Sequence, residues 1–221
     1  MLAKRFNVEE TGAKLVYERL HENYNIAPTQ TEPTIIGNGK DRAIELMRWG
    51  FVAPWMKDLK DTFKYSSFNA RSEDIFNKPM WKLAIRQTRC LVPANGFYEW
   101  LNTPSGKQPF YIKPRDQEIF SFAGLYGFWK DAEGMEWPNY SIITTHANKE
   151  MLDVHHRMPV IVHPGDETRW LDSEIDTPED LLNIMQPYPD GHLEIIKVSR
   201  EVNSSRNDGP TLIKPLRSER N

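Results

Sequence analysis

The chain has 221 residues, a formal net charge of -3 and one cysteine, Cys90. Its length fits one large domain or two small ones, and its 39% hydrophobic content is enough for a substantial core. The negative charge excludes nucleic-acid binding by global charge, so such contacts need a local basic groove. One cysteine excludes an intramolecular disulfide, and no apolar run is long enough to span a membrane. Both observations favour a soluble protein of the reducing cytosol.

The first half of the chain predicts few regular elements. In order, these are a helix over 2–9, an extended loop over 23–32, a strand over 43–49, an exposed charged segment over 57–65 and a helix over 79–86. The first helix rests on Leu2 and Phe6, which lie four residues apart and therefore share a face. The loop rests on Pro28, which biases the residue before it away from helical dihedrals.

The second half of the chain predicts mainly strands. They run over 89–100, 109–114, 119–129, 140–145, 159–162 and 193–198. Thr177 and Pro178 open a helix, because Thr is a good N-cap residue and Pro suits the first helical position. No repeat or clear linker interrupts the chain, so we expect one α+β domain over 1–221 with a loose tail over 214–221.

Three short polar segments lie among core-like neighbours, at 69–73, 96–100 and 155–159. Burying unpaired polar groups costs several kcal/mol, so a chain that places them there usually uses them. Together they supply an amide, a carboxylate, imidazoles and guanidiniums. That set suits proton transfer next to an anionic substrate.

Glu99 lies among aromatic residues, which would raise the pKa of its carboxyl group and make it a usable general acid. A surface glutamate on an edge strand is the alternative. His155 and His156 are adjacent, which does not match the spacing of a helical metal pair. One of them is a candidate catalytic residue, and two ordinary loop histidines are the alternative. We therefore predict no metal site.

Asn69 and Arg71 would share a face of an extended segment and offer an amide and a guanidinium to one ligand. Arg157, at a strand entrance, could hold a phosphate or carboxylate bidentately, and a structural ion pair is its alternative. Trp49, Trp55 and Trp100 are either base-stacking platforms or core residues. Cys90 is expected to be a buried small apolar residue.

In this order and spacing, the segments resemble the SOS-response-associated peptidase (SRAP) family, which shields abasic sites in single-stranded DNA. The matching segments are 24–30, 48–50, 69–73, 89–94, 96–100, 155–159, 198–199 and 203–213. The resemblance implies an α+β domain with a barrel-like, mainly antiparallel β core, flanking short helices and a positively charged groove. It implies a monomer in the bacterial cytosol that needs no cofactor and no membrane.

The resemblance also implies roles for individual residues. Glu99 would assist opening of the abasic sugar ring, His155 would move protons, and Asn69 would orient the amine or the sugar. The remaining implied residues contact DNA. Arg71 and Arg157 would hold phosphates, and Trp55, Pro28 and Thr144 would line the groove.

The family's reaction uses an N-terminal cysteine exposed by removal of the initiator methionine. Its amine condenses with the ring-opened aldehyde, water leaves, and the thiolate adds to the imine carbon to close a thiazolidine. An autopeptidase activity removes residues that precede this cysteine. The resemblance thus implies an enzyme of the peptidase or hydrolase class with lyase-like chemistry on abasic DNA.

This sequence opens Met1-Leu2-Ala3-Lys4-Arg5-Phe6 and shows no such cysteine. Residues 2–9 instead match the helix that family members carry after the cysteine-bearing strand. An internal start, a short gene model and a real loss all remain open. Cys90 has no free α-amine, so the chain as written is predicted to form no thiazolidine. A non-covalent module for single-stranded DNA and a hydrolase unrelated to DNA are the competing hypotheses.

Overall fold

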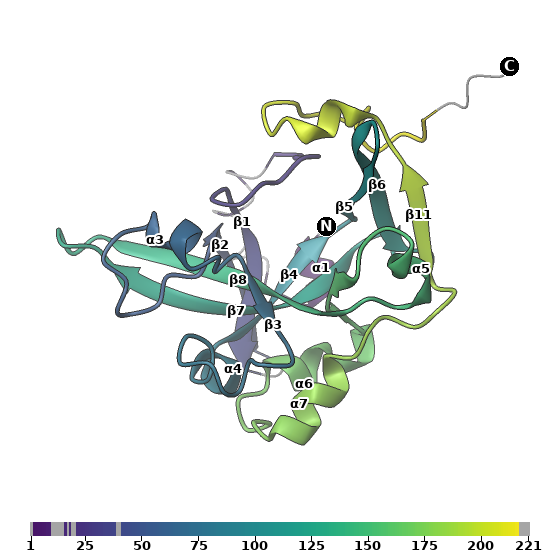
Figure 1. Cartoon of the computed structure of the whole chain (residues 1–221). Coiled ribbons are helices and arrows are strands. Elements are labelled where there is room, and N and C mark those ends of the chain that lie inside the picture. The colour runs from purple at the N-terminus through teal and green to yellow at the C-terminus, as the bar shows by residue number, and fades with distance from the viewer. Residues whose placement is uncertain (1, 10–15, 17, 19–20, 39–40, 217–221) are drawn as a thin grey trace, which may run out of the picture.

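The computed structural model describes residues 2–9, 16, 18, 21–38 and 41–216. They form an α+β fold around a closed barrel of five strands (Figure 1). The barrel strands are β1 (Thr31–Asn38), β2 (Asp41–Trp49), β4 (Arg89–Ala94), β7 (Phe120–Lys130) and β8 (Glu136–His146). Pairing of β7 with β8 closes the ring. The barrel is mixed, because β2 runs parallel to β8 whereas its other pairs are antiparallel.

The barrel interior is filled by aliphatic side chains from facing strands. Ile35 of β1, Leu91 of β4, Leu125 of β7 and Ile143 of β8 are all fully buried. Ile35 and Leu91 are register partners where β1 pairs with β4. This core fixes the barrel rim, where three short strands continue the larger sheet: β3 (Asn69–Arg71), β9 (Arg157–Pro159) and β10 (Ile161–Val162).

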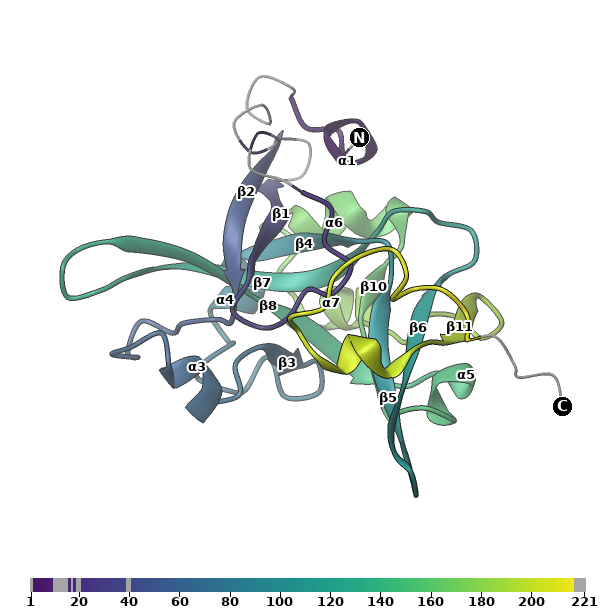
Figure 2. The ribbon, with the colours of Figure 1, turned by 90° about the horizontal axis from the view of Figure 1, so that it is seen from above.

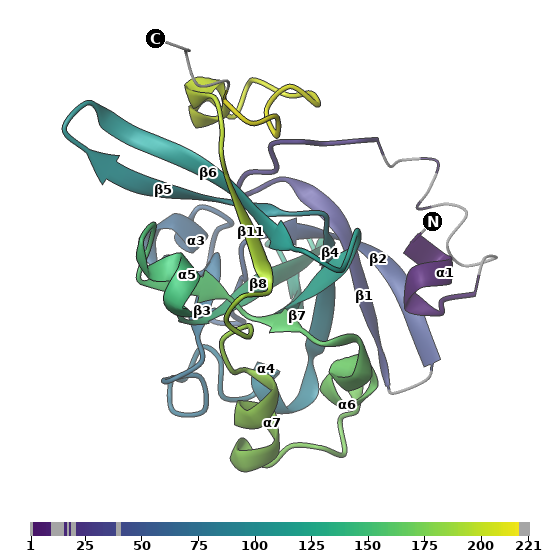
Figure 3. The ribbon, with the colours of Figure 1, turned by 90° about the vertical axis from the view of Figure 1, so that its right-hand side faces the viewer.

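A second sheet contains β5 (Phe97–Thr103), β6 (Gly106–Pro114) and β11 (Leu193–Lys197), in the order β11-β6-β5. The hairpin of β5 and β6 reaches out from the body, as the side view in Figure 3 shows. The C-terminal segment that follows β11 lies over this sheet, on the side away from α6 (Glu167–Leu171) and α7 (Pro178–Ile184).

The helices are short and lie around the barrel (Figure 2). Besides α6 and α7, they are α1 (Leu2–Phe6), α3 (Asp61–Lys64), α4 (Ala84–Gln87), α5 (Lys149–Leu152) and two 3-10 turns, Pro164–Asp166 and Arg200–Asn203. A buried ion pair holds α1 to the body. Arg5 donates to both carboxylate oxygens of Glu167, at 2.8 and 3.1 Å, and Glu167 is only 3% exposed.

The structure confirms the predicted α+β class with a barrel-like core and most of the predicted strands. The helix expected over 2–9 ends at Phe6, where Asn7 adopts a φ of 52°. Thr177 caps α7 as predicted, because its side chain accepts from the Asp180 N–H. The tail over 217–221 lies outside the described residues, and 214–216 are exposed.

Three further predicted elements differ from the structure. The helix expected over 79–86 is wrong for most of its length, since 72–83 form turns and only Ala84–Gln87 are helical. The strand expected over 89–100 breaks at Gly96, where a Cβ atom would lie 2.2 Å from the ring of Tyr111. The loop expected over 23–32 ends at Gln30, because β1 begins at Thr31.

Candidate functional site

Glu99 lies on β5, an edge strand, but its side chain is only 23% exposed. Phe110 of β6 is its cross-strand partner. Burial raises the pKa of the Glu99 carboxyl group, while His155 and the N–H of Trp100 partly oppose this shift. Glu99 therefore lies on an edge strand, as the alternative interpretation predicted, but its side chain is not fully exposed. The result is a carboxyl group that holds its proton more tightly than usual.

His155 is the nearest titratable neighbour of Glu99 and lies between α5 and β9. Its Nδ1 atom is 3.6 Å from Oε1 of Glu99. The same nitrogen lies 3.3 Å from the Arg157 N–H, which donates to it, and 3.1 Å from the Arg157 carbonyl. Either protonation state of Nδ1 therefore finds a partner. The ring of His156 lies 4.5 Å from that of His155, centroid to centroid.

Asn69 and Arg71 begin and end β3, which pairs in parallel with β8. They are two residues apart on a strand and therefore share a face. Both side chains are exposed and line one open cavity of about 300 Å³. Within the described part of the chain, neither side chain has a hydrogen bond or an ion pair in the structure. An unpaired amide and an unpaired guanidinium thus face a common space.

Arg157 differs from Asn69 and Arg71, because its guanidinium already has hydrogen-bond partners. It donates to both carboxylate oxygens of Glu73, at 2.9 and 3.1 Å, and to the carbonyl and hydroxyl oxygens of Thr144. Its side chain is 13% exposed. Burial opposes ionisation of Glu73, but the hydrogen bond from Arg157 and its charge outweigh burial and lower the pKa. The ion-pair alternative for Arg157 is therefore the arrangement found.

Thr144 joins these parts, since Arg71 is its register partner across β3 and β8 and Pro159 its partner across β9. The contacts from Arg71 through Thr144, Arg157 and His155 to Glu99 form one continuous path along the barrel rim. Residues that were separate in the sequence are thus neighbours in space.

The predicted groove residues occupy different settings. Trp55 is 50% exposed, and its ring meets Tyr65 edge to face at 4.9 Å, which places it next to the cavity. Pro28 is exposed in the loop before β1. The indole N–H groups of Trp49 and Trp100 donate hydrogen bonds within the protein, so these rings are not free base-stacking platforms. The indole of Trp49 stacks on Tyr140 and donates to the carbonyl of Phe68.

Hydrogen bonds to the C-terminal segment hold the region around Glu99 in place, and sequence patterns did not predict them. Asn25 is buried and donates to the carbonyls of Val202, Ser204 and Asn207. Trp100 donates to the side-chain oxygen of Asn203 at 2.7 Å. These bonds tie the loop before β1 and the strand of Glu99 to the C-terminal segment. The turn-forming composition of 199–209 signalled an ordered loop, but not its partners.

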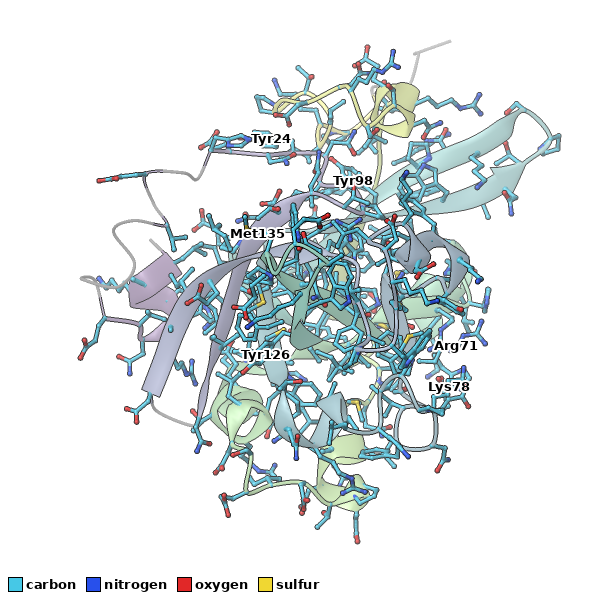
Figure 4. All side chains as sticks on the ribbon, turned by 90° about the vertical axis from the view of Figure 1, so that its left-hand side faces the viewer. Tyr24, Arg71, Lys78, Tyr98, Tyr126 and Met135 are labelled. Carbon is cyan, nitrogen blue, oxygen red and sulfur yellow. The ribbon has the colours of Figure 1, made fainter. Side chains whose placement is uncertain are left out.

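Tyr24 and Tyr98 add to these contacts, and Figure 4 shows them near each other at the top of the molecule. The Tyr98 hydroxyl donates to the Tyr24 carbonyl at 2.8 Å, and the Tyr24 N–H donates to Asp208. Desolvation raises the pKa of Tyr98, so this hydroxyl keeps its proton and remains a donor. These contacts thus include Tyr98, the residue before Glu99.

Cys90 is fully buried in β4, as predicted, and burial raises the pKa of its thiol. The buried thiol is therefore not a nucleophile for a ligand at the rim. Among the described residues, no group of three or more His, Cys, Asp or Glu side chains is arranged to hold a metal ion. In the same part of the chain, no helix is long and apolar enough to cross a bilayer.

The chain is thus an α+β protein with a mixed barrel, whose rim carries the partly buried Glu99–His155 contact and an open cavity lined by Arg71. The model of the family "SOS response associated peptidase (SRAP)" matches residues 1–205. The chain therefore belongs to the SRAP family.

Two curated relatives are named for abasic-site processing. The abasic site processing protein YoqW of Bacillus subtilis (strain 168) is 38% identical over 213 residues, covering 96% of this chain and 93% of that protein. The abasic site processing protein HMCES of Gallus gallus is 31% identical over 230 residues, covering 90% and 67%. These relatives support a function related to abasic-site DNA.

The fold agrees with this assignment. A crystal structure of a protein from Bacteroides thetaiotaomicron superposes with a TM-score of 0.87 at 26% identity, covering 97% of this chain and 94% of that chain. A second, from Bordetella bronchiseptica, gives a TM-score of 0.60 at 29% identity and covers 80% and 82%.

Proposed function

We propose that this protein binds single-stranded DNA at abasic sites and brings the deoxyribose against Glu99, His155 and Asn69. The observation that carries the proposal is the placement of the partly buried Glu99–His155 pair on the same rim as an unpaired amide and guanidinium. An abasic nucleotide needs both, because its sugar exchanges protons while its phosphates stay anionic. The abasic-site names of the relatives support this choice of substrate.

The chemistry assigned to the pair is opening of the sugar ring. The closed sugar is a hemiacetal, so opening removes a proton from the C1′ hydroxyl and adds one to the ring oxygen. Glu99, whose carboxyl group holds its proton more tightly than usual, is the donor in this proposal, and His155 is the acceptor. Asn69 orients the sugar, with Trp55 packing on a neighbouring base. The same pair would suit an autopeptidase step.

Cys90 does not fit the covalent step that the family's reaction uses. Among these 221 residues the one thiol is Cys90, which is buried in the barrel and carries no α-amine. We therefore do not propose Cys90 as the thiol that closes a thiazolidine on the opened aldehyde. Non-covalent binding of single-stranded DNA is the alternative function that this same observation favours.

The test incubates the purified chain with a single-stranded oligonucleotide carrying a natural abasic site, beside an intact strand of the same sequence. We expect tighter, salt-sensitive binding to the abasic strand and no adduct that survives denaturing electrophoresis. A denaturation-resistant adduct would overturn the non-covalent alternative, and equal binding to the intact strand would overturn the choice of substrate.

Variants separate the chemistry from binding. Glu99→Gln should keep binding but slow the appearance of free aldehyde, measured with an aldehyde-reactive hydroxylamine probe, by about 100-fold. Glu133→Gln, a change of the same kind at an exposed turn, is the matched control and should leave the rate unchanged. An unchanged rate in Glu99→Gln would remove Glu99 from the reaction.

A further inference from the structure

The cavity beside β3 has a second cationic wall that the proposed site does not use. Its lining residues are Tyr65, Ser66, Asn69, Arg71, Lys78, Met80 and Trp81. Arg71 comes from the strand, and Lys78 comes from the turns that follow it, so two unlike segments place a positive charge on the same space. Figure 4 shows the two residues close together on one side of the molecule.

Asp74 supplies the negative charge that Lys78 binds in this structure. The Lys78 ammonium lies 2.8 Å from a carboxylate oxygen of Asp74, and both side chains are about half exposed. The hydrogen bond and charge of Lys78, together with the charges of Arg71 and Arg157, lower the pKa of Asp74. One carboxylate thus lies in the field of three cations, where a larger anion would experience the same attraction.

The three cations differ in how freely they can exchange partners. Arg157 is held in a bidentate pair with Glu73 and by Thr144, and little of it is exposed. Lys78 has one exposed carboxylate partner, and exposed pairs of this kind contribute little to stability. Arg71 has no carboxylate partner among the described residues. Exchange to a new anion is therefore easiest at Arg71 and Lys78.

We propose that Lys78 and Arg71 form a phosphate seat for the DNA strand next to the abasic nucleotide, and that Asp74 is the internal carboxylate that the phosphate replaces on Lys78. This inference rests on the proposed function, since it names how that site takes the strand. Arg71 binds the phosphate from the side of β3, and Lys78 binds it from the opposite wall. Asp74 keeps the seat occupied until DNA arrives.

The test measures fluorescence anisotropy of a labelled single-stranded oligonucleotide with a tetrahydrofuran abasic analogue, over a series of salt concentrations. Lys78→Gln should weaken binding about tenfold at low salt, because it removes a charge-assisted contact. It should also reduce the slope of log K against log salt by about 0.7, the value for one phosphate on a single strand. Asp74→Asn should tighten binding about threefold, because it removes the competing carboxylate.

Lys82→Gln is the matched control, since Lys82 is a nearby exposed lysine that does not line the cavity. It should change neither the affinity beyond about twofold nor the slope. Equal losses in Lys78→Gln and Lys82→Gln, or weaker binding in Asp74→Asn, would overturn the seat while leaving the proposed function in place. Absence of single-strand binding by the unaltered chain would overturn both. Thermal unfolding of each variant confirms that the fold is kept.

Discussion

At the scale of single residues, Glu99 shows how burial changes the chemistry of a carboxyl group. Its folded-state pKa is raised, mainly by desolvation. A raised folded-state pKa means that the folded protein binds this proton more tightly than the unfolded chain does. The stability linked to the proton is therefore fully present below the ordinary glutamate pKa and is lost as pH rises through the raised value.

This sign gives a prediction for Glu99→Gln. At neutral pH the variant should unfold at a higher temperature than the unaltered protein, by a few degrees, because it no longer buries a carboxylate. The gain should disappear below about pH 4, where both folded and unfolded chains carry a protonated Glu99. Thermal denaturation followed by circular dichroism across pH measures this. A less stable variant at neutral pH would mean that pairing with His155 outweighs burial.

The sequence identified these site residues where a local pattern carried the information. Glu99 stands out because aromatic residues surround it, and His155 because it lies in a short polar segment among core-like neighbours. The partner of Arg157 could not be found this way, since Glu73 lies far away in the chain and meets it only because β3 and β9 both flank β8. The carbonyl contacts of Asn25 depend on long-range folding in the same manner.

At the scale of elements, Arg89 holds the ends of two short helices to the barrel. It is 3% exposed, and its guanidinium donates to the carbonyls of Ile85, Arg86, Trp170, Asp172 and Ile175. The last carbonyls of a helix have no partner within it, so one buried cation satisfies groups of both α4 and α6. Burial lowers the pKa of Arg89 to about 10.

Arg89→Met should therefore be strongly destabilising. Methionine fills similar space but leaves several carbonyls without donors, so we expect a loss of about 3 kcal/mol in the free energy of unfolding. Urea denaturation measures it. Arg86→Met, at a half-exposed arginine of α4 itself, should cost no more than about 1 kcal/mol. Comparable losses in both variants would show that Arg89 acts only as one more surface charge.

Elements were predictable where side-chain pattern and local turn signals agreed. The strand β2 and the cap of α7 follow from such agreement. The strand β1 was missed because Pro33 and Gly37 lie inside it, and both residues usually mark turns. The helix over 79–86 was predicted because Pro79 suits a first helical turn, but pairing of β3 with β8 and the contacts of the segment after β3 decide its path.

At the scale of the whole molecule, charge is distributed against the simplest expectation for a DNA-binding protein. The net charge is -3 and the isoelectric point is about 6.1. The proposed DNA binding therefore depends on a few local cations on the barrel rim, with the negative net charge opposing it. The fold class followed from composition and strand pattern, whereas the closing of the barrel by β7 and β8 required the three-dimensional structure.

This distribution predicts a shallow salt dependence for single-strand binding. Arg71 and Lys78 share one phosphate in the proposed seat, so the slope of log K against log salt should be about -0.7. Anisotropy titrations of the unaltered protein over a salt series measure the slope. A slope near zero would exclude phosphate contacts, and a much steeper one would require a far wider basic surface than this rim.

The contacts of the C-terminal segment with the β5–β6 hairpin determine when the site can form during synthesis of the chain. Glu99 emerges early, yet its sheet receives a third strand only when β11 has left the exit tunnel, and Asn203 must follow before Trp100 finds its acceptor. Until then β5 and β6 form only a two-stranded hairpin, which is marginal in water. The strand that carries Glu99 thus reaches its final packing only after the chain has been made beyond Asn203.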